Sequence, residues 1–130
     1  MCTAVLHWNP GGVLAVMNRD ERRDRADEIP PGRFDADGVS YLAPRDSERG
    51  GTWIGVSERG VAAFILNGYV PGDLELVGRS DVPSRGSIVP ALLTHDADGA
   101  RDRLQRRFDP SPYASFTVIL AAPDGAMVSR

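Results

Sequence analysis

The chain has a single cysteine, Cys2, directly after the initiator methionine. A side chain as small as cysteine at this position favours removal of Met1, which would leave a thiol and a free α-amine on the same residue. Because a thiol and an α-amine titrate within about one pH unit of each other, the amine can accept the thiol proton near neutral pH. Cys2 is therefore a candidate N-terminal nucleophile that needs no histidine base. The alternative is that Cys2 is only a small residue tolerated after methionine.

Two apolar segments, residues 3–8 and 13–17, flank Asn9-Pro10-Gly11-Gly12 and predict a β-hairpin. If the turn centres on residues 10–11, residue 2 lies opposite residue 19, which brings Arg19 and Asp20 beside the N-terminus. An acid there can orient an α-amine, and a guanidinium beside the sulfur favours the thiolate. The alternative is that the alternating charges of residues 19–25 form a solvated loop.

Asn67 ends a second predicted hairpin, in which residues 53–56 and 61–66 form the strands. At a strand end, its amide could donate a hydrogen bond to an oxyanion; the alternative is an ordinary turn residue before Gly68. Trp53 is expected to pack in the core or at its rim. His7 and His95 are too few and too far apart for a zinc site, and we expect no metal.

The remaining elements are predicted from periodicity and punctuation. A charged stretch at residues 19–28 and a Pro/Gly-rich loop through residue 38 precede a short strand at residues 39–42. Ser84 or Ser87 is expected to cap a helix through residue 93, and Asp96 or Asp98 a second helix to residue 108. Strands follow at residues 116–122 and from residue 126. This order predicts an antiparallel sheet with helices packed on one face.

Composition limits the classes of function. The 130 residues, 42% of them hydrophobic, are the size of one domain, residues 1–130. A net charge of −3 argues against a nucleic-acid partner, and the absence of lysine excludes a Schiff-base mechanism. One cysteine cannot form an internal disulfide, and the apolar run at residues 61–66 is too short for a membrane span. We expect a cytoplasmic protein.

Several motifs together resemble the NRDE family, also called the transport and Golgi organisation protein two family. The resemblance runs over most of the chain and rests on Met1-Cys2-Thr3, Asn18-Arg19-Asp20-Glu21, Gly50-Gly51-Thr52-Trp53-Ile54-Gly55-Val56-Ser57, Arg59-Gly60, Asn67 and Ser84-Arg85-Gly86-Ser87-Ile88-Val89. The Met-Cys-Thr start and the turn before an Asn-tipped strand are also similar to the bile-salt hydrolase and penicillin V acylase group. That group consists of N-terminal nucleophile hydrolases.

The resemblance implies an α+β fold, an αββα sandwich of the N-terminal nucleophile hydrolase type. It implies that Cys2 attacks an amide or ester carbonyl while Asn67 helps to hold the oxyanion. The hydrolases carry Arg-Asn-x-Asp where this chain has Asn18-Arg19-Asp20-Glu21, so roles within this tetrad can differ by one position. Members of both groups are longer, and a later Asn and Arg of the hydrolase site have no counterpart here. We therefore expect the N-terminal half of the sandwich, with an open sheet flank that favours self-association, including a homo-oligomer.

Two functional hypotheses follow. In the first, the protein hydrolyses a small-molecule amide, ester or thioester without a cofactor: Cys2 is the nucleophile, its amine the base, Asp20 orients the amine, Arg19 tunes the thiol and Asn67 binds the oxyanion. Binding residues would be Asn18, Glu21 and Trp53. In the second, the protein binds or carries haem or an acyl lipid without catalysis, and the thiol serves as a ligand. A preserved nucleophile is compatible with both.

Overall fold

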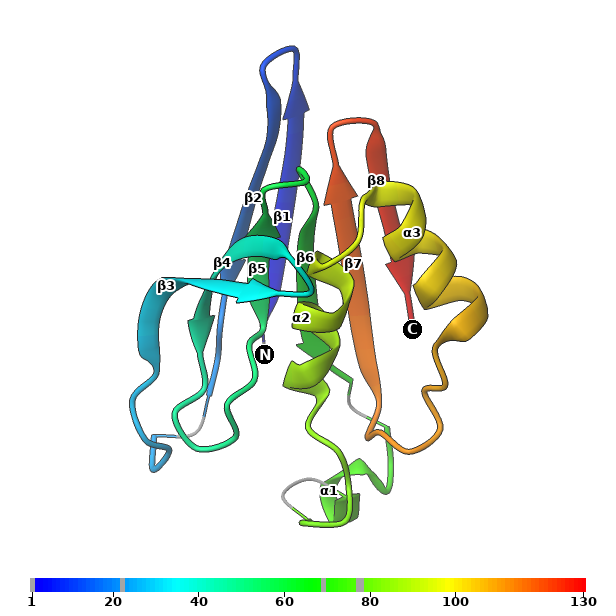
Figure 1. Cartoon of the computed structure of the whole chain (residues 1–130). Helices are drawn as coiled ribbons and strands as arrows, with labels where there is room; N and C mark the ends of the chain where they lie inside the picture. The colour runs from blue at the N-terminus through cyan, green and yellow to red at the C-terminus, as the bar shows by residue number, and fades with distance from the viewer. Residues whose placement is uncertain (1, 22, 69, 77–78) are drawn as a thin grey trace.

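The computed structural model has a mixed α/β architecture with two antiparallel sheets (Figure 1). It describes residues 2–21, 23–68, 70–76 and 79–130. Within these residues, the larger sheet joins strands in chain order: β3 (Ile29–Ala36), β4 (Val39–Arg45), β5 (Ile54–Ser57), β6 (Ala62–Asn67), β7 (Phe116–Ala122) and β8 (Gly125–Ser129). The smaller sheet is the hairpin of β1 (Thr3–Asn9) and β2 (Gly12–Asn18).

Short helices lie in the long connection between β6 and β7. They are α1 (Asp73–Leu76), a 3-10 turn at Arg85–Ser87, α2 (Ile88–Leu93) and α3 (Ala97–Asp102), which continues as a π-helical turn at Arg103–Arg107. The carboxylate of Asp96 caps α3 by accepting the Gly99 N–H at 2.8 Å, as expected for the first of its two candidates. Ser84 and Ser87 occupy the N-cap positions of the 3-10 turn and of α2, but neither side chain accepts a capping hydrogen bond. None of the helices in the described ranges has the length and apolarity to cross a membrane.

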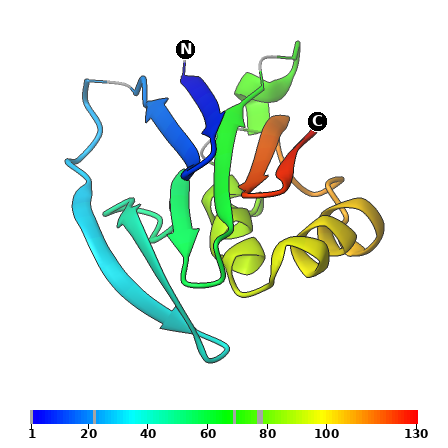
Figure 2. The same cartoon turned by 90° about the horizontal axis from the view of Figure 1, so that it is seen from above.

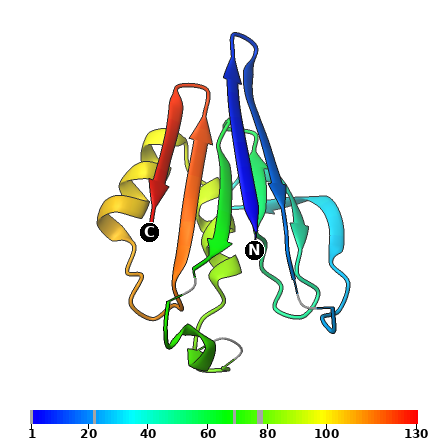
Figure 3. The same ribbon diagram turned by 180° about the vertical axis from the view of Figure 1, so that it is seen from behind.

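The larger sheet lies between a helical layer and the β1–β2 hairpin. Figure 1 shows α2 and α3 in front of the sheet, Figure 3 shows the hairpin on the opposite face, and Figure 2 shows this stacking from above. In β6, Ala63 and Ile65 pack in the core on the helical side, whereas Ala62 and Phe64 pack toward the hairpin. Burial on both faces explains why residues 61–66 are continuously apolar rather than alternating.

The first hairpin has the predicted register. Thr3 pairs with Asn18 and Asn9 with Gly12, so the position before Thr3 lies opposite Arg19. The strand predictions at residues 39–42, 53–56, 61–66 and 116–122 are confirmed within a few residues. The antiparallel sheet with helices on one face is confirmed as well.

The expected loop before residue 38 is wrong, because residues 29–36 form β3. Pro30 and Pro31 lack an N–H for the ladder, but β3 is an edge strand and its register shifts between Ile29 and Gly32. Phe34 and Ala36 pack against the core on the helical side. Tertiary burial of these two side chains outweighs the local Pro/Gly signal.

Candidate functional site

The Cys2 sulfur contacts the main chain of Asp20, as the hairpin register requires. The Asp20 N–H donates to Cys2 Sγ at 3.4 Å, and the thiol lies 3.8 Å from the Asp20 carbonyl oxygen. Cys2 is half-buried and precedes β1 on the face that carries Ala4 and Leu6, which pack toward the larger sheet. A main-chain N–H directed at sulfur interacts most strongly with the thiolate form.

A pocket of about 110 Å³ surrounds this thiol and brings together most of the residues proposed from the sequence. Its lining comes from the ends of β1, β2, β4 and β6 and from the loops beside them: Cys2, Arg19, Asp20, Glu21, Arg25, Asp46, Gly51, Thr52, Trp53, Ile65, Asn67, Ser84, Arg85 and Gly86. Asn18, the remaining predicted residue, is the exposed last residue of β2 and is not part of this lining.

The Arg19 guanidinium is bound by carboxylates and an aromatic ring. Its Nη2 lies 2.9 Å from Glu21 Oε2, and its Nη1 lies 3.4 Å from Glu28 Oε2. Its Cζ stands 4.1 Å from the ring centroid of Trp53, a distance at which a cation is attracted to an indole face. Trp53 therefore supports Arg19 in addition to lining the pocket.

Asn67 lies at a fixed strand end. It pairs with Phe116 of β7, and the following N–H, of Gly68, donates to the Ser115 carbonyl at 2.9 Å. The N–H and the hydroxyl of Ser115 both donate to the Asp73 carboxylate, the N–H at 3.2 Å. These hydrogen bonds join the loop after β6 to the start of β7. The exposed Asn67 side chain thus stands on a braced backbone.

Two glycines bring the segment 84–86 against the entry to β5. The Thr52 N–H donates to the Gly86 carbonyl at 3.0 Å, and a Cβ on Gly51 would lie only 2.7 Å from the Gly86 carbonyl carbon. This contact positions Arg85 in the pocket wall, where its Nη1 donates to the Ser115 carbonyl at 2.8 Å. Gly51 and Gly86 are therefore required, because the two backbones lie too close together to leave room for a Cβ at either position.

A larger hollow of about 370 Å³ adjoins the thiol pocket. Both hollows are lined by Glu21, Arg25, Asn67, Ser84 and Arg85. The larger one adds four apolar residues, Leu76, Val82, Pro83 and Ala114, and three charged residues, Asp24, Glu48 and Arg49. Together the hollows have the size of a small-molecule site, with the thiol at one end and an outer part that combines apolar and charged side chains.

Sequence reasoning missed three charged residues that line the thiol pocket, namely Arg25, Asp46 and Arg85. Arg85 belongs to the Ser84-Arg85-Gly86 motif, which was a usable signal, although it was interpreted only as the start of a helix. Arg25 and Asp46 carry no motif and meet only through loop packing, where Arg25 Nη2 donates to Asp46 Oδ2. No local pattern could have predicted this pair.

The described residues offer no grouped set of three His, Cys, Asp or Glu side chains for a metal ion. His7 is exposed on β1, and neither His7 nor His95 belongs to the described lining of either hollow. A haem in this cleft would therefore have Cys2 as its thiolate ligand and no described histidine beside it.

Comparison with known proteins agrees with the resemblance in the sequence. No curated protein matches the chain at a significant level. The family model of Transport and Golgi organisation 2 matches residues 1–128, a span that includes every residue of the thiol pocket. The chain belongs to the Transport and Golgi organisation 2 family.

Proposed function

We propose that the protein is an N-terminal cysteine hydrolase that acts on a small linear amide, ester or thioester. The observation that carries the proposal is the convergence of Cys2, Asp20 and Asn67 in one pocket, although they come from three separate strand ends. Each has the residue type that the chemistry needs: a nucleophile, an acid beside the N-terminus and an amide donor.

The proposed reaction begins when the α-amine of Cys2 takes the thiol proton. Sγ then bonds to the substrate carbonyl carbon, and the carbonyl electron pair moves to oxygen, where the Asn67 amide donates a hydrogen bond. Collapse breaks the bond to the leaving nitrogen, oxygen or sulfur, which receives the proton from the ammonium. Water then hydrolyses the acyl-thioester on Cys2 by the same steps, with the amine again as base.

The layers of the fold support a matching proposal about architecture. Helices, a six-stranded sheet and a second sheet stack in that order, which corresponds to the first three layers of an αββα sandwich of the N-terminal nucleophile hydrolase type. We also propose a cytoplasmic location, because a reducing compartment keeps the thiol free. A homo-oligomer belongs to the same proposal and is argued in the Discussion.

The test is hydrolysis of matched p-nitrophenyl esters, anilides and thioesters, with intact mass to detect an acyl group on Cys2. We expect Cys2→Ala and the nearly isosteric Cys2→Ser to lose turnover, and Asn67→Ala to lower kcat by about 100-fold. Turnover that survives Cys2→Ala would overturn the proposal. Acylation in Asn67→Ala at the wild-type rate would remove Asn67 from the oxyanion site.

The second candidate function, binding of haem or an acyl lipid without catalysis, is favoured by the apolar part of the larger hollow. Leu76, Val82 and Ala114 can cover an apolar ligand that reaches the thiol. A haem titration of wild type and Cys2→Ala distinguishes the two functions. A thiolate-type absorption band that Cys2→Ala abolishes, in a protein that hydrolyses none of the acyl substrates, would favour binding.

A further inference from the structure

Main-chain N–H groups of the turn that follows β4 orient the Asp46 carboxylate, in addition to the arginine side chains that contact it. Its Oδ1 accepts the N–H groups of Glu48 at 2.9 Å and Arg49 at 3.0 Å. Its main-chain N–H donates to the Gly51 carbonyl at 2.8 Å, and its carbonyl accepts the Gly50 N–H at 2.9 Å. The side chain is 13% exposed. Asp46 is therefore a fixed anchor at the end of β4.

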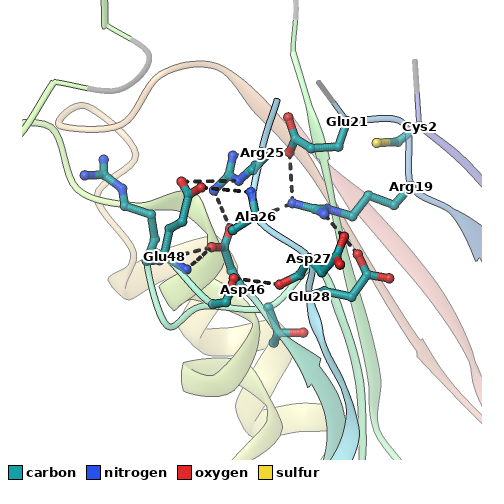
Figure 4. Close-up of polar contacts among 12 residues, drawn as sticks. Cys2, Arg19, Glu21, Arg25, Ala26, Asp27, Glu28, Asp46 and Glu48 are labelled. Carbon is teal, nitrogen blue, oxygen red and sulfur yellow. Dashed lines mark hydrogen bonds and ion pairs between the residues drawn. The ribbon is translucent and has the colours of Figure 1, made fainter. Parts of the chain in front are cut away.

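The other carboxylate oxygen, Oδ2, faces two arginines. Arg25 Nη2 donates to it, and Arg19 Nη2 lies 3.8 Å away. Both arginines also reach Glu21 Oε2, Arg19 at 2.9 Å and Arg25 at 3.2 Å. Asp46, Arg25, Glu21 and Arg19 thus form a closed ring of alternating charge, here called the charge ring, and all four line the Cys2 pocket (Figure 4).

The Asp46 side chain stays ionised within this ring. Burial on its own would raise the pKa of Asp46. The N–H groups of Arg49 and Glu48 and the charges of Arg25 and Arg19 outweigh burial and hold the pKa below its usual value of 3.8. The charge ring is part of a larger ion-pair network, because Arg19 also lies 3.4 Å from Glu28 and Arg25 lies 3.8 Å from Glu48.

We propose that Asp46 is a positioning residue of this site, which holds Arg19 and Arg25 on the pocket wall and sets the charge that the wall presents to the Cys2 sulfur. Its effect on turnover rests on the hydrolase function proposed above. Its effect on the thiol does not, because the charge acts on the sulfur whether or not a substrate is cleaved. Loss of the Asp46 charge would remove one negative charge from the pocket wall and so favour the thiolate.

Other charged groups also face the thiol and must stay constant in the test. Asp20 and Arg85 line the same pocket, Glu28 and Glu48 pair with the two arginines of the charge ring, and removal of Met1 would add the α-amine of Cys2. Substitution of Asp46 leaves all of these groups in place. The difference between variant and wild type therefore reports the charge ring rather than the absolute environment of the sulfur.

The experiment measures the rate of Cys2 alkylation by iodoacetamide from pH 5 to pH 9. We expect Asp46→Asn to move the midpoint of the profile to lower pH, so that alkylation below the midpoint is about two- to threefold faster, with the high-pH plateau unchanged. Arg25→Gln removes a cation and should move the midpoint to higher pH. Asp46→Glu keeps the charge and should keep the wild-type midpoint.

Asp124→Asn is the matched control, because Asp124 pairs with Arg101 at 2.8 Å outside the cleft. It should leave the profile unchanged. If Asp46 only stabilised the fold, the midpoint would not move to lower pH when a carboxylate is removed and to higher pH when a guanidinium is removed. Equal midpoints in wild type, Asp46→Asn and Arg25→Gln would overturn the proposal, and if Asp46→Asn does not fold, the direction of the Arg25→Gln shift decides.

Hydrolysis provides the second measurement. Asp46→Asn should raise KM and lower kcat/KM about tenfold, because the wall that faces the substrate loses its anchor, and Asp46→Glu should restore part of this loss. Absence of turnover in the wild type would contradict the hydrolase function, while the alkylation profiles would still decide the role of Asp46. Normal turnover in Asp46→Asn together with an unmoved profile would overturn that role and leave the hydrolase function intact.

Discussion

At the scale of single residues, the chemistry proposed for Cys2 depends on its α-amine as much as on its thiol. An amide nitrogen is not a base, so any residue retained before Cys2 removes the proton acceptor and leaves the thiol in place. We therefore predict that the mature protein lacks Met1. We also predict that an uncleaved N-terminal extension lowers kcat by about 100-fold or more, which is typical for loss of a general base.

Intact mass of untagged protein and acyl hydrolysis with and without the extension check this prediction. The same tag placed at the C-terminus is the control and should leave turnover unchanged. Equal activity with an N-terminal extension would show that the amine is not the base.

Asp73 is a second residue whose ionisation affects the cleft, because it braces the loop after Asn67. The Ser115 hydroxyl first, then the N–H groups of Val70 and Ser115, hold the pKa of Asp73 below its usual 3.8. A carboxyl with a lower pKa in the folded state stabilises the fold fully above its unfolded pKa, and this contribution is lost as pH falls through the folded-state value. We predict that Ser115→Ala raises the pKa of Asp73 toward 3.8 and reduces this acid-sensitive contribution.

A carbon-detected NMR titration of the Asp73 carboxyl measures the change. Asp109 is the internal control, since the Ser111 hydroxyl and N–H lower its pKa in the same way and Ser115→Ala does not touch them. An Asp73 titration that does not move would mean that the Ser115 hydroxyl is not the main cause.

At the scale of elements, the docking of segment 84–86 on the entry to β5 decides where Arg85 lies. We predict that Gly51→Ala destabilises the protein by about 1–3 kcal/mol, because the new Cβ would meet the Gly86 backbone, which cannot rotate away as a side chain can. Arg85 should be displaced from the pocket at the same time. Chemical denaturation measures the free energy of unfolding, and Cys2 alkylation reports the change in the pocket.

Gly32→Ala is the matched control for this prediction. A Cβ there meets only the Phe34 ring, at an ordinary 3.9 Å, so the free energy of unfolding should change by less than about 1 kcal/mol. Equal destabilisation by both substitutions would show that the contact between Gly51 and Gly86 has no special role.

Elements also show what the sequence could predict. The hairpin turn and the period-2 pattern were sufficient to place Cys2 beside Asp20, because antiparallel register follows from turn position alone. The direction of the Arg19 side chain depends on Glu21, Glu28 and Trp53. Of these, Trp53 lies in a loop that is distant from Arg19 in sequence. Contacts between loops leave no periodic signal, and for this reason Asp46 emerged only from the structure.

At the scale of the whole molecule, the β1–β2 hairpin is buried on one face only. Ala4, Leu6, Val13, Ala15 and Met17 pack toward the larger sheet, whereas the outward side chains include Val5 at 59%, Leu14 at 59% and Val16 at 54% exposure. Within the described residues, β1 and β2 pair only with each other, so each also has an open edge. An apolar sheet face beside open edges favours association with another chain.

We therefore predict that the 130-residue chain self-associates through this hairpin face. The triple variant Val5→Thr, Leu14→Thr and Val16→Thr keeps β-branched or strand-compatible side chains but removes apolar surface, so it should sediment as a smaller species at equal concentration. Cys2 alkylation should stay unchanged, because these side chains face away from the pocket. Val128→Thr, at an equally exposed site on β8, is the control: it distinguishes association through the hairpin face from association through the edge of the larger sheet. Analytical ultracentrifugation over a range of concentrations decides: a wild-type protein that remains monomeric throughout, or a triple variant that associates as the wild type does, would show that this face is not an interface.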